Sequence, residues 1–556
     1  MTRLLPLLLL FCLYYPDASR ALPQAATPAV GKSDLSAADQ LYRAGNFAGA
    51  AEKYQTILKT EPGSAAAQVG LIRSLLRLEK IDEAMTLAKS ALTAQPNSAA
   101  LSAVMGDVQF RWGEMSPAEL SYRQALKLDP ANADAYLGLA RIYRAYSLYG
   151  HAYSCLQRAH ELAPDNPEVQ RMWFGELSKK DRIAAIEKYL AGPHPDNQEE
   201  TGGLQRYLGF LKATAAQSHA CKLANKVEQT TTKLETLRTD PTHDFGVGLV
   251  VGVNGHETRL QLDTGASGIV ISRRAAAKAG LTSVSEEEYY GLGDSGARRG
   301  YSAIATDIRV GDLQFHDCVV DVTDGVSVTS EDGLIGADVF SSYLIDIDIP
   351  DHKLKLSPLP SRPNEISTPA TLKTEEESDS GEGQSARESK STETTAEQNQ
   401  PKASAEEPKP LDRYVAPEMK DWTAVFRFGS HLLIPTHIDA SPSMLFLIDT
   451  GSMMTMLSKR EATHFTSVHT DPDTEVKGLN GSVSKVYRAS KVMLRFGHLS
   501  QKNQGIISFD LSDLSRHMGT EVSGILGFET LYMLQIKIDY RDGLVDFVYD
   551  PKRWER

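Results

Sequence analysis

The sequence predicts a multidomain chain in which an all-α helical repeat array is followed by two mainly-β lobes. Three observations predict this fold class. Prolines recur every 34 residues between residues 62 and 164, and alternating β-branched runs replace the helical pattern after Cys221. The last part of the chain then repeats residues of the part before it at an offset of 186. The 556 residues suffice for three or four domains.

Composition and simple motifs exclude several classes of protein. Hydrophobic residues make up 41% and charged residues 24%, unlike collagen, a wholly disordered chain or a multispan membrane protein. A net charge of -13 argues against a nucleic-acid partner, because phosphate binding needs a basic surface. The 4 cysteines show no zinc-ligand spacing, so we expect no metal. Gly291, Gly293 and Gly296 fit a dinucleotide motif, but a strand pattern follows them, so we expect no cofactor.

The amino terminus, residues 1–21, has the features of a signal peptide. Arg3 supplies a positive start, residues 4–15 are mainly apolar, and Ser19 and Ala21 are small residues at cleavage spacing. The apolar run is shorter than the roughly 20 residues that cross a bilayer. We expect cleavage after Ala21 and an exported chain, periplasmic or secreted, without a later membrane span. An uncleaved anchor is the alternative.

Residues 31–215 form the predicted helical array. Two residue types mark its repeats in one register: Pro62, Pro96, Pro130 and Pro164, and Ala50, Ala84, Ala118 and Ala152. Alanine lets helices approach closely, and proline ends the second helix of each unit. Residues 166–215 continue as helix and are expected to cap the stack. The period and the pattern resemble tetratricopeptide repeats. That resemblance implies a solenoid with a concave surface for a peptide or a protein partner; a spacer is the alternative.

The two β lobes are predicted at residues 222–358 and 415–556. The offset of 186 aligns the Asp-Thr-Gly triplet 263–265 with the triplet 449–451. It also aligns three later positions: Tyr301, Arg309 and Gly311 with Tyr487, Arg495 and Gly497. A Gly-Leu-Ile-Gly segment ends at Gly336, and a Gly-Ile-Leu-Gly segment ends at Gly527. These matches predict an internal duplication.

An apolar strand that ends in Asp-Thr-Gly, followed by a hydrophobic-hydrophobic-Gly segment, resembles the lobe of retropepsin-like (retroviral-type) aspartic proteases. The resemblance covers nearly half the chain. It implies that Asp263 and Asp449 face each other and activate a water molecule for peptide hydrolysis. Two carboxylates about 3 Å apart cannot both ionise, so such a pair holds one proton and supplies both an acid and a base.

The same resemblance implies roles for the neighbouring residues. Thr264 and Thr450 would cross-bond the two loops, and Gly265 and Gly451 would aim amide hydrogens at the carboxylates. Further supporting positions are Ala266, Ser452, Gly336 and Gly527, and the glycines of two candidate flaps are Gly291, Gly293, Gly478 and Gly481. One position departs from the family: Ser267 follows the first motif, but Met453 follows the second, where a hydrogen-bonding residue is usual.

The function that these residues predict is an exported aspartic endopeptidase whose array recruits its polypeptide substrate or a partner. Because of Met453, the alternative is a non-enzymatic periplasmic adaptor that uses the repeats and inactive lobes for protein binding. The two lobes can pair within one chain or by homodimerisation, and the sequence leaves both open.

Two further expectations concern the cysteines and the segment between the lobes. Cys155, Cys221 and Cys318 follow the signal peptide. A Cys221–Cys318 disulfide is favoured because both residues lie in one lobe; three thiols are the alternative. Residues 361–413 carry 12 acidic and 7 basic residues, a charge of -5, and no aromatic residue. We therefore expect a disordered acidic linker, with self-cleavage there as a possible activation step.

Overall fold

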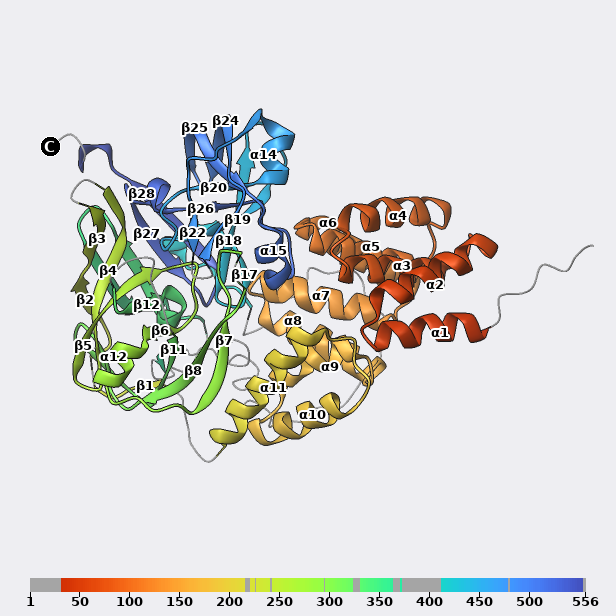
Figure 1. Cartoon of the computed structure of the whole chain (residues 1–556), viewed down its shortest axis with the longest axis horizontal. Helices are drawn as coiled ribbons and strands as arrows, with labels where there is room; N and C mark the ends of the chain where they lie inside the picture. Colours follow the sequence, from red (N-terminus) through yellow and green to blue (C-terminus); the bar gives the residue numbers. More distant parts are fainter. Residues whose placement is uncertain are drawn as a thin grey trace, which may run out of the picture.

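The structure is a computed structural model of the chain, with the helices on one side of the molecule and the β lobes on the other (Figure 1). It describes residues 32–553 except residues 216–220, 226, 241–242, 295, 324–330, 364–370, 373–411 and 479–480. The predicted signal peptide and most of the predicted linker lie outside the described residues. A helical repeat region followed by a β-rich region confirms the predicted fold class.

The array consists of antiparallel helix pairs followed by a capping group. Its elements are α1 (Lys32–Arg43), α2 (Phe47–Thr60), α3 (Ala65–Arg77), α4 (Ile81–Ala94), α5 (Ala99–Arg111), α6 (Met115–Leu128), α7 (Ala133–Ala145), α8 (Tyr149–Leu162), α9 (Pro167–Trp173), the 3-10 turn η1 (Phe174–Glu176), α10 (Lys179–Ala191) and α11 (Gln198–Ala213). Each second helix ends two residues before one of the periodic prolines, which cannot continue a helix.

Glycine and tyrosine explain the close packing of the repeats. A Cβ atom at Gly106 or Gly138 would lie 2.6 or 2.2 Å from the Tyr122 ring. Tyr122 is fully buried, so these glycines make room for its ring between helices. The Tyr54 ring of α2 lies in the same way against Gly70 of α3.

The first lobe is built on a 12-stranded sheet. Its elements are β1 (Cys221–Leu223), β3 (Glu235–Asp240), β4 (His243–Val253), β5 (His256–Asp263), β6 (Ile269–Ser272), α12 (Arg273–Lys278), β7 (Ser285–Tyr289), β8 (Arg298–Ala305), β9 (Ile308–Val310), β10 (Leu313–His316), β11 (Cys318–Thr323), β12 (Gly333–Gly336), the 3-10 turn η2 (Ala337–Phe340) and β15 (Thr371–Leu372). A disulfide joins Cys221 to Cys318, which is the pairing that the sequence favoured.

The second lobe is built on an 8-stranded sheet. Its elements are β17 (Phe426–Phe428), β18 (His431–Ile438), β19 (Met444–Ile448), β20 (Met456–Ser458), α14 (Lys459–Phe465), β21 (Val468–Thr470), β22 (Lys477–Gly478), β23 (Gly481–Ser482), β24 (Tyr487–Phe496), β25 (Leu499–Phe509), α15 (Ser512–Met518), β26 (Gly524–Leu526) and α16 (Phe528–Leu531). The strand order β4-β5-β12-β6-β11-β8-β7 of the first lobe recurs here as β18-β19-β26-β20-β25-β24-β21.

A 6-stranded sheet joins the two lobes of one chain. It contains β2 (Thr230–Lys233), β14 (Lys353–Pro358) and β13 (Tyr343–Asp348) from the first lobe, and β27 (Leu534–Asp539), β28 (Leu544–Tyr549) and β16 (Thr423–Ala424) from the second. The central pairing is antiparallel, with Ile345 opposite Ile538 and Ile347 opposite Ile536. All four isoleucines are fully buried, so the two lobes share one hydrophobic core.

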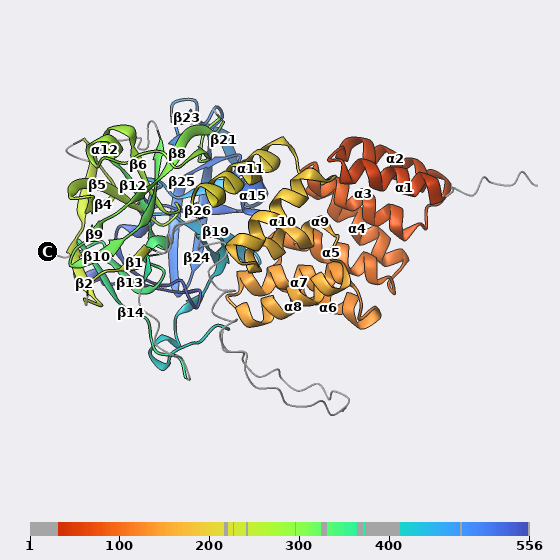
Figure 2. The ribbon, with the colours of Figure 1, turned by 90° about the horizontal axis from the view of Figure 1, so that it is seen from below.

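The array packs directly against the second lobe, and α15 lies at their boundary (Figures 1 and 2). Buried side chains of α6 and α7 belong to the same hydrophobic cluster as side chains of β19, β25 and β26. The Phe110 ring lies 5.9 Å from the Phe428 ring, and the Thr520 hydroxyl donates to the Phe110 carbonyl over 2.8 Å. The array is therefore part of the folded body that holds the lobes.

A few residues of the predicted linker 361–413 are described, and they contact the folded parts of the chain. Thr371 and Leu372 form β15, an edge strand that pairs with β1. Asp412 is buried, bridges to Leu148 and accepts a hydrogen bond from the His151 backbone amide over 3.1 Å. The remainder of the predicted linker lies almost entirely outside the described residues, so its disorder stays a prediction. Within the described residues, no helix has the length and apolar character to cross a bilayer.

Candidate active site

Asp263 and Asp449 stand at equivalent ends of two strands. Asp263 is the last residue of β5, and Asp449 directly follows β19. In each lobe a parallel neighbour lies beside this strand: β12 pairs with β5, with Gly336 opposite Asp263, and β26 pairs with β19. The two acidic residues are thus presented at the same edge of two similarly ordered sheets.

The two loops are cross-bonded by their threonines. The Thr264 hydroxyl donates to the Ile448 carbonyl over 2.8 Å, and it accepts from the Thr450 amide over 2.9 Å. The Thr450 hydroxyl donates to the Leu262 carbonyl over 2.9 Å and accepts from the Thr264 amide over 3.1 Å. Both threonines are fully buried, so each hydroxyl satisfies two groups of the opposite lobe.

The two carboxyl groups form a coupled pair. Burial raises the pKa of Asp263 well above its ordinary value, and the neighbouring charge and hydrogen bond of Asp449 raise it further. Burial also raises the pKa of Asp449, while hydrogen bonds from Asp263 and from the Ser452 and Gly451 amides lower it in part. Like charges at contact distance disfavour double ionisation, so the pair retains a proton above the pH at which an ordinary aspartate loses it.

The glycine after each threonine lets the opposite carboxyl group approach. A Cβ atom on Gly265 would lie 2.5 Å from Cγ of Asp449, and one on Gly451 would lie 2.2 Å from Cγ of Asp263. The Gly265 amide donates to Asp263 Oδ1 over 2.8 Å, and the Gly451 amide donates to Asp449 Oδ1 over 2.9 Å. Any side chain at either glycine would separate the two acids.

The first-lobe loop is held from behind by a carboxyl group. Asp338, which is 2% exposed, accepts from the Ser267 hydroxyl over 3.0 Å and from the Gly268 amide over 3.1 Å. A Cβ atom on Gly336 would lie 2.6 Å from the Ala266 carbonyl oxygen, so this glycine lets the supporting strand approach the loop. Burial raises the pKa of Asp338 to about 6, although the bonds from Gly268 and Ser267 lower it in part.

The second-lobe loop is held by hydroxyl groups. The Thr455 hydroxyl lies 2.6 Å from the Thr530 hydroxyl and accepts from the Gly527 amide over 3.0 Å. Ser452 donates to the Met454 carbonyl over 3.0 Å. Met453 is 41% exposed, and only its backbone carbonyl contributes here, accepting from the Glu529 amide over 3.0 Å. The loop is therefore supported although Met453 lacks a polar side chain.

The two glycine-rich hairpins meet each other. Gly291 and Gly293 lie in the turn between β7 and β8, and Gly478 and Gly481 end β22 and begin β23. The Ser484 amide donates to Asp294 over 2.7 Å, and the Asp294 amide donates to the Ser482 carbonyl over 3.3 Å. A Cβ atom on Gly478 would lie 2.2 Å from the Leu292 carbonyl oxygen.

Sequence reasoning missed several residues that hold the loops. These are Gln261, Asp338, Thr455 and Thr530. The Gln261 side-chain amide donates across the lobes to the Gly451 carbonyl over 3.3 Å. Asp338 could have been found, since it follows Gly336 by two residues, but the second copy has Glu529 there. The other contacts link positions that are not equivalent in the two copies, so the offset carries no signal for them.

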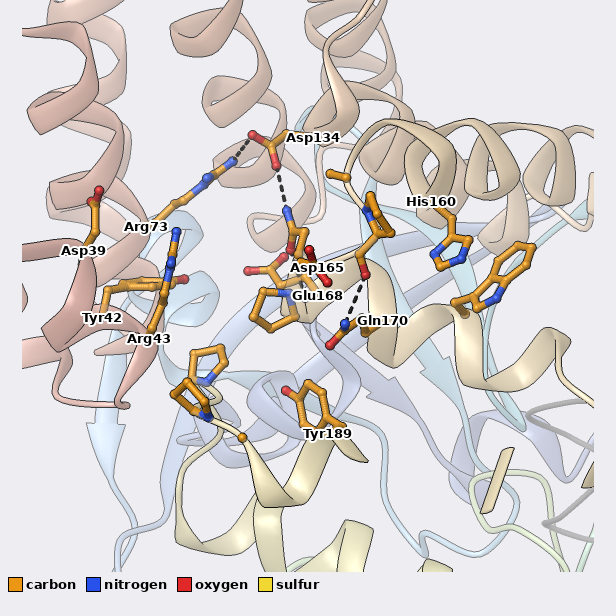
Figure 3. Close-up of a pocket in the computed structure, with 18 of the residues that line it drawn as sticks. Asp39, Tyr42, Arg43, Arg73, Asp134, His160, Asp165, Glu168, Gln170 and Tyr189 are labelled. Atoms are coloured by element: carbon orange, nitrogen blue, oxygen red, sulfur yellow. Dashed lines mark hydrogen bonds and ion pairs between the residues drawn. The ribbon is translucent and has the colours of Figure 1, made fainter. Parts of the chain in front are cut away.

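A second candidate site is a cavity of about 1070 Å³ within the array, whose lining includes residues of α1, α3, α9 and α10 (Figure 3). Arg73 reaches Asp134 over 2.7 Å, and Arg141 reaches Glu168 over 2.7 Å. Burial raises the pKa of Glu168, but the charges of Arg141 and Arg73 outweigh burial and hold it at about 2. No metal-binding group of three His, Cys, Asp or Glu side chains occurs in the described part of the chain.

Comparisons with known proteins agree with both halves of this architecture. Residues 249–339 match the family model of aspartyl proteases, and residues 41–108 match that of tetratricopeptide repeats. Anaphase-promoting complex subunit 7 of Arabidopsis thaliana is 34% identical over 147 residues, which are 26% of each chain. Cellulose synthase operon protein C of Pseudomonas fluorescens (strain SBW25) is 28% identical over 161 residues, 28% of this chain and 12% of that protein. The chain thus spans about a quarter or less of these curated relatives.

One solved structure is similar to a larger share of the chain. The aspartic proteinase of Irpex lacteus has a TM-score of 0.32 and 12% identity, and the match covers 58% of this chain and 97% of that one.

Proposed function

We propose that this chain is an aspartic endopeptidase in which Asp263 and Asp449 form one catalytic pair. The observation that supports this most strongly is the facing carboxyl pair itself, of which Asp449 is buried and Asp263 partly buried. Thr264 and Thr450 cross-bond its loops, and the amides of Gly265 and Gly451 donate to its carboxyl groups. A site built only to bind a peptide has no need of two carboxyl groups whose charges oppose each other.

The proposed reaction uses the single proton that the pair holds. The ionised carboxylate accepts a proton from the attacking water, and the protonated carboxyl donates to the carbonyl oxygen of the substrate. The resulting tetrahedral intermediate is not covalently bound to the enzyme. The loop amides that donate to Oδ1 of each aspartate fix the carboxyl planes, so the acid and the base keep their positions.

The test of this proposal is cleavage of a denatured protein by single variants. Asp263→Asn and Asp449→Asn are each expected to abolish cleavage, because neither partner alone supplies both an acid and a base. Asp351→Asn, in the exposed turn between β13 and β14, is the matched control and is expected to retain activity. Activity in Asp449→Asn would favour a homodimer of first lobes, and activity in both variants would exclude the aspartic mechanism.

The competing proposal is a non-enzymatic adaptor, for which Met453 was the reason. The support of the second loop by Thr455 and Thr530 weakens that reason. A peptide that contains a statine-type transition-state mimic separates the two proposals. Binding of this peptide together with turnover of a peptide library supports the enzyme, whereas binding with no turnover of any library member supports the adaptor.

We propose that the array recruits the polypeptide substrate or a protein partner. The support is the cavity of about 1070 Å³, which offers aromatic and charged side chains such as Tyr42, Arg43 and Tyr189 (Figure 3). In an Asp263→Asn chain, which should hold substrate without cleaving it, Arg43→Glu is expected to weaken binding of a denatured protein. Unchanged binding would favour the spacer role.

We also propose that the chain is exported. The signal-like residues 1–21 and the Cys221–Cys318 disulfide support an oxidising compartment. Mass spectrometry of the mature protein is expected to find an amino terminus at Leu22, and a retained Met1 would support the uncleaved anchor.

A further inference from the structure

The helical array touches the first-lobe hairpin, formed by β7, β8 and the turn between them. The Arg206 guanidinium of α11 lies 2.9 Å from the Glu288 carboxylate of β7. The charge of Arg206 also acts on the Glu287 carboxyl group, so Arg206 is the cation that faces this part of β7. The two side chains of the ion pair are 23% and 29% exposed, which leaves the pair partly screened by solvent.

A second contact fixes the same hairpin where its turn begins. The Tyr290 ring lies 4.9 Å from the His517 ring of α15. His517 Nε2 is 2.8 Å from one Glu199 oxygen, and the Arg516 guanidinium is 3.0 Å from the other. Glu199 lies on α11, so this helix is bound both to the hairpin and to the second-lobe helix on which the hairpin rests.

The tip of the hairpin is held by the second lobe. Leu292 packs against the hydrophobic cluster that the array shares with that lobe, together with Val476 and Val483. Asp294 bonds to Ser482 and Ser484 of the opposite hairpin. The described contacts therefore hold both β7 and the turn after it, and α11 makes one of them directly, the Arg206–Glu288 ion pair.

We infer that α11 is a latch: its Arg206 holds Glu288, and its Glu199 holds His517 beside Tyr290. The first-lobe hairpin then moves away from the second-lobe hairpin only when these contacts break. This inference deepens the proposed function, because it makes the array control entry to the same site. The latch residues Arg206, Glu199 and Tyr290 line a cavity of about 750 Å³ together with Arg73 and Arg141 of the array. The latch thus lies at a cavity between the array, the first-lobe hairpin and α15.

Hydrogen–deuterium exchange of the full chain tests the latch without any need for activity. Arg206→Glu places a carboxylate beside the Glu288 carboxylate and within reach of the charge of Glu287, and Glu288→Arg places two guanidinium groups together. Each single variant is expected to speed amide exchange in residues 285–305 by about three- to fivefold, the size of effect that a partly exposed ion pair exerts on an equilibrium. Exchange that is unchanged in both variants would overturn the inference.

Two further variants distinguish a specific contact from general damage. The double variant Arg206→Glu/Glu288→Arg restores an ion pair and is expected to return exchange in residues 285–305 to the wild-type rate. Lys212 also lies on α11 but pairs with Glu187 of α10 inside the array, in a more exposed ion pair; Lys212→Glu is expected to leave that exchange unchanged. A double variant that exchanges as fast as the single variants would contradict the latch.

The association rate of a statine-containing peptide supplies a readout of access to Asp263 and Asp449. The rate is expected to rise about three- to fivefold in Arg206→Glu and to return in the double variant. A rate that does not change while exchange in the hairpin rises would overturn the control of entry. If the peptide binds no variant at all, the proposed protease function fails, and the exchange experiment still decides whether the latch exists.

Discussion

The two lobes present the same Asp-Thr-Gly loop but hold it from behind by different chemistry. In front, each threonine hydroxyl makes the same two bonds across the lobes. Behind, the first loop rests on the buried carboxyl group of Asp338, and the second rests on the hydroxyl pair of Thr455 and Thr530. The hydrogen bonds that are alike in the two lobes therefore lie at the interface, and those that differ lie within each lobe.

This difference teaches which features of the loop are tightly constrained. The cross-bonds must serve two loops at once, so a change in one lobe disturbs the other. Support from behind has to satisfy only local backbone groups, and either a carboxylate or a hydroxyl can accept from an amide. Met453 thus lies in the part of the loop that differs between the two lobes, whereas the threonine cross-bonds are the part that the lobes share.

The largest loss of stability is expected when a threonine hydroxyl that cross-bonds the two loops is removed. Thr264→Val or Thr450→Val leaves one buried carbonyl and one buried amide without a partner in the opposite lobe. Each variant is expected to lose about 2–5 kcal/mol of unfolding free energy in urea denaturation, and the two losses should be similar. Thr→Ser at either position, which keeps the hydroxyl, is the control. A loss of unfolding free energy in only one of the two valine variants would contradict the equivalence of the two threonine cross-bonds.

Removing the side chain that supports each loop from behind should cost unequal amounts of unfolding free energy in the two lobes. Asp338→Ala removes the acceptor of the Ser267 hydroxyl and the Gly268 amide and is expected to cost about 2–4 kcal/mol. Thr530→Val should cost about 1 kcal/mol, because Thr455 still accepts from the Gly527 amide. Thermal or urea unfolding of both variants measures the difference. Equal losses would show that the two supports do not differ in the way that their contacts indicate.

The pair of Asp263 and Asp449 should make the unfolding free energy of the protein depend on pH. Burial raises the folded-state pKa of both Asp263 and Asp449, and the charge of Asp449 raises that of Asp263 further, so the native state binds more protons than the unfolded state. Stability from this pair is fully present below the unfolded pKa and falls as pH rises through the folded values. Asp263→Asn removes the repulsion, so its stability relative to wild type should increase by up to about 1.4 kcal/mol per pH unit above pH ~4. A difference that is constant between pH 4 and 7 would contradict the coupling.

The smallest effect is expected at the position where the two motifs differ. Met453→Ser changes an exposed side chain whose backbone carbonyl keeps its bond from the Glu529 amide. The variant should change the unfolding free energy by less than about 0.5 kcal/mol and leave kcat/KM for a peptide substrate unchanged. A large gain in activity would show that Met453 does weaken the second loop.

The sequence allowed the front of the site to be predicted, because its residues recur at one offset. Thr264 and Thr450 occupy equivalent positions and make equivalent bonds. Asp338 was missed because its equivalent, Glu529, has a different role, in which its amide donates to the Met453 carbonyl. A carboxylate in one copy and a hydroxyl pair in the other cannot be recognised by comparing the copies.

Most of the other structural features that the sequence did not predict are contacts between elements far apart in the chain. The 34-residue spacing predicted the helix pairs, but not that Phe110 would meet Phe428 or that α11 would meet β7. The pairing of β13 with β27 was also absent from the expectations, because alternating strands predict a sheet without naming the neighbour. Such contacts depend on how complete elements pack, which a local pattern does not report.

The most direct test of the central claim is to mix the two inactive single variants. If Asp263 and Asp449 of one chain form the site, equimolar Asp263→Asn and Asp449→Asn chains refolded together from urea should show no cleavage of a denatured protein. If the pair forms between chains, refolding should produce intact pairs and restore a substantial fraction of wild-type activity. Recovery of activity would contradict the shared site within one chain, and continued inactivity beside an active, equally refolded wild-type control is the result that this structure predicts.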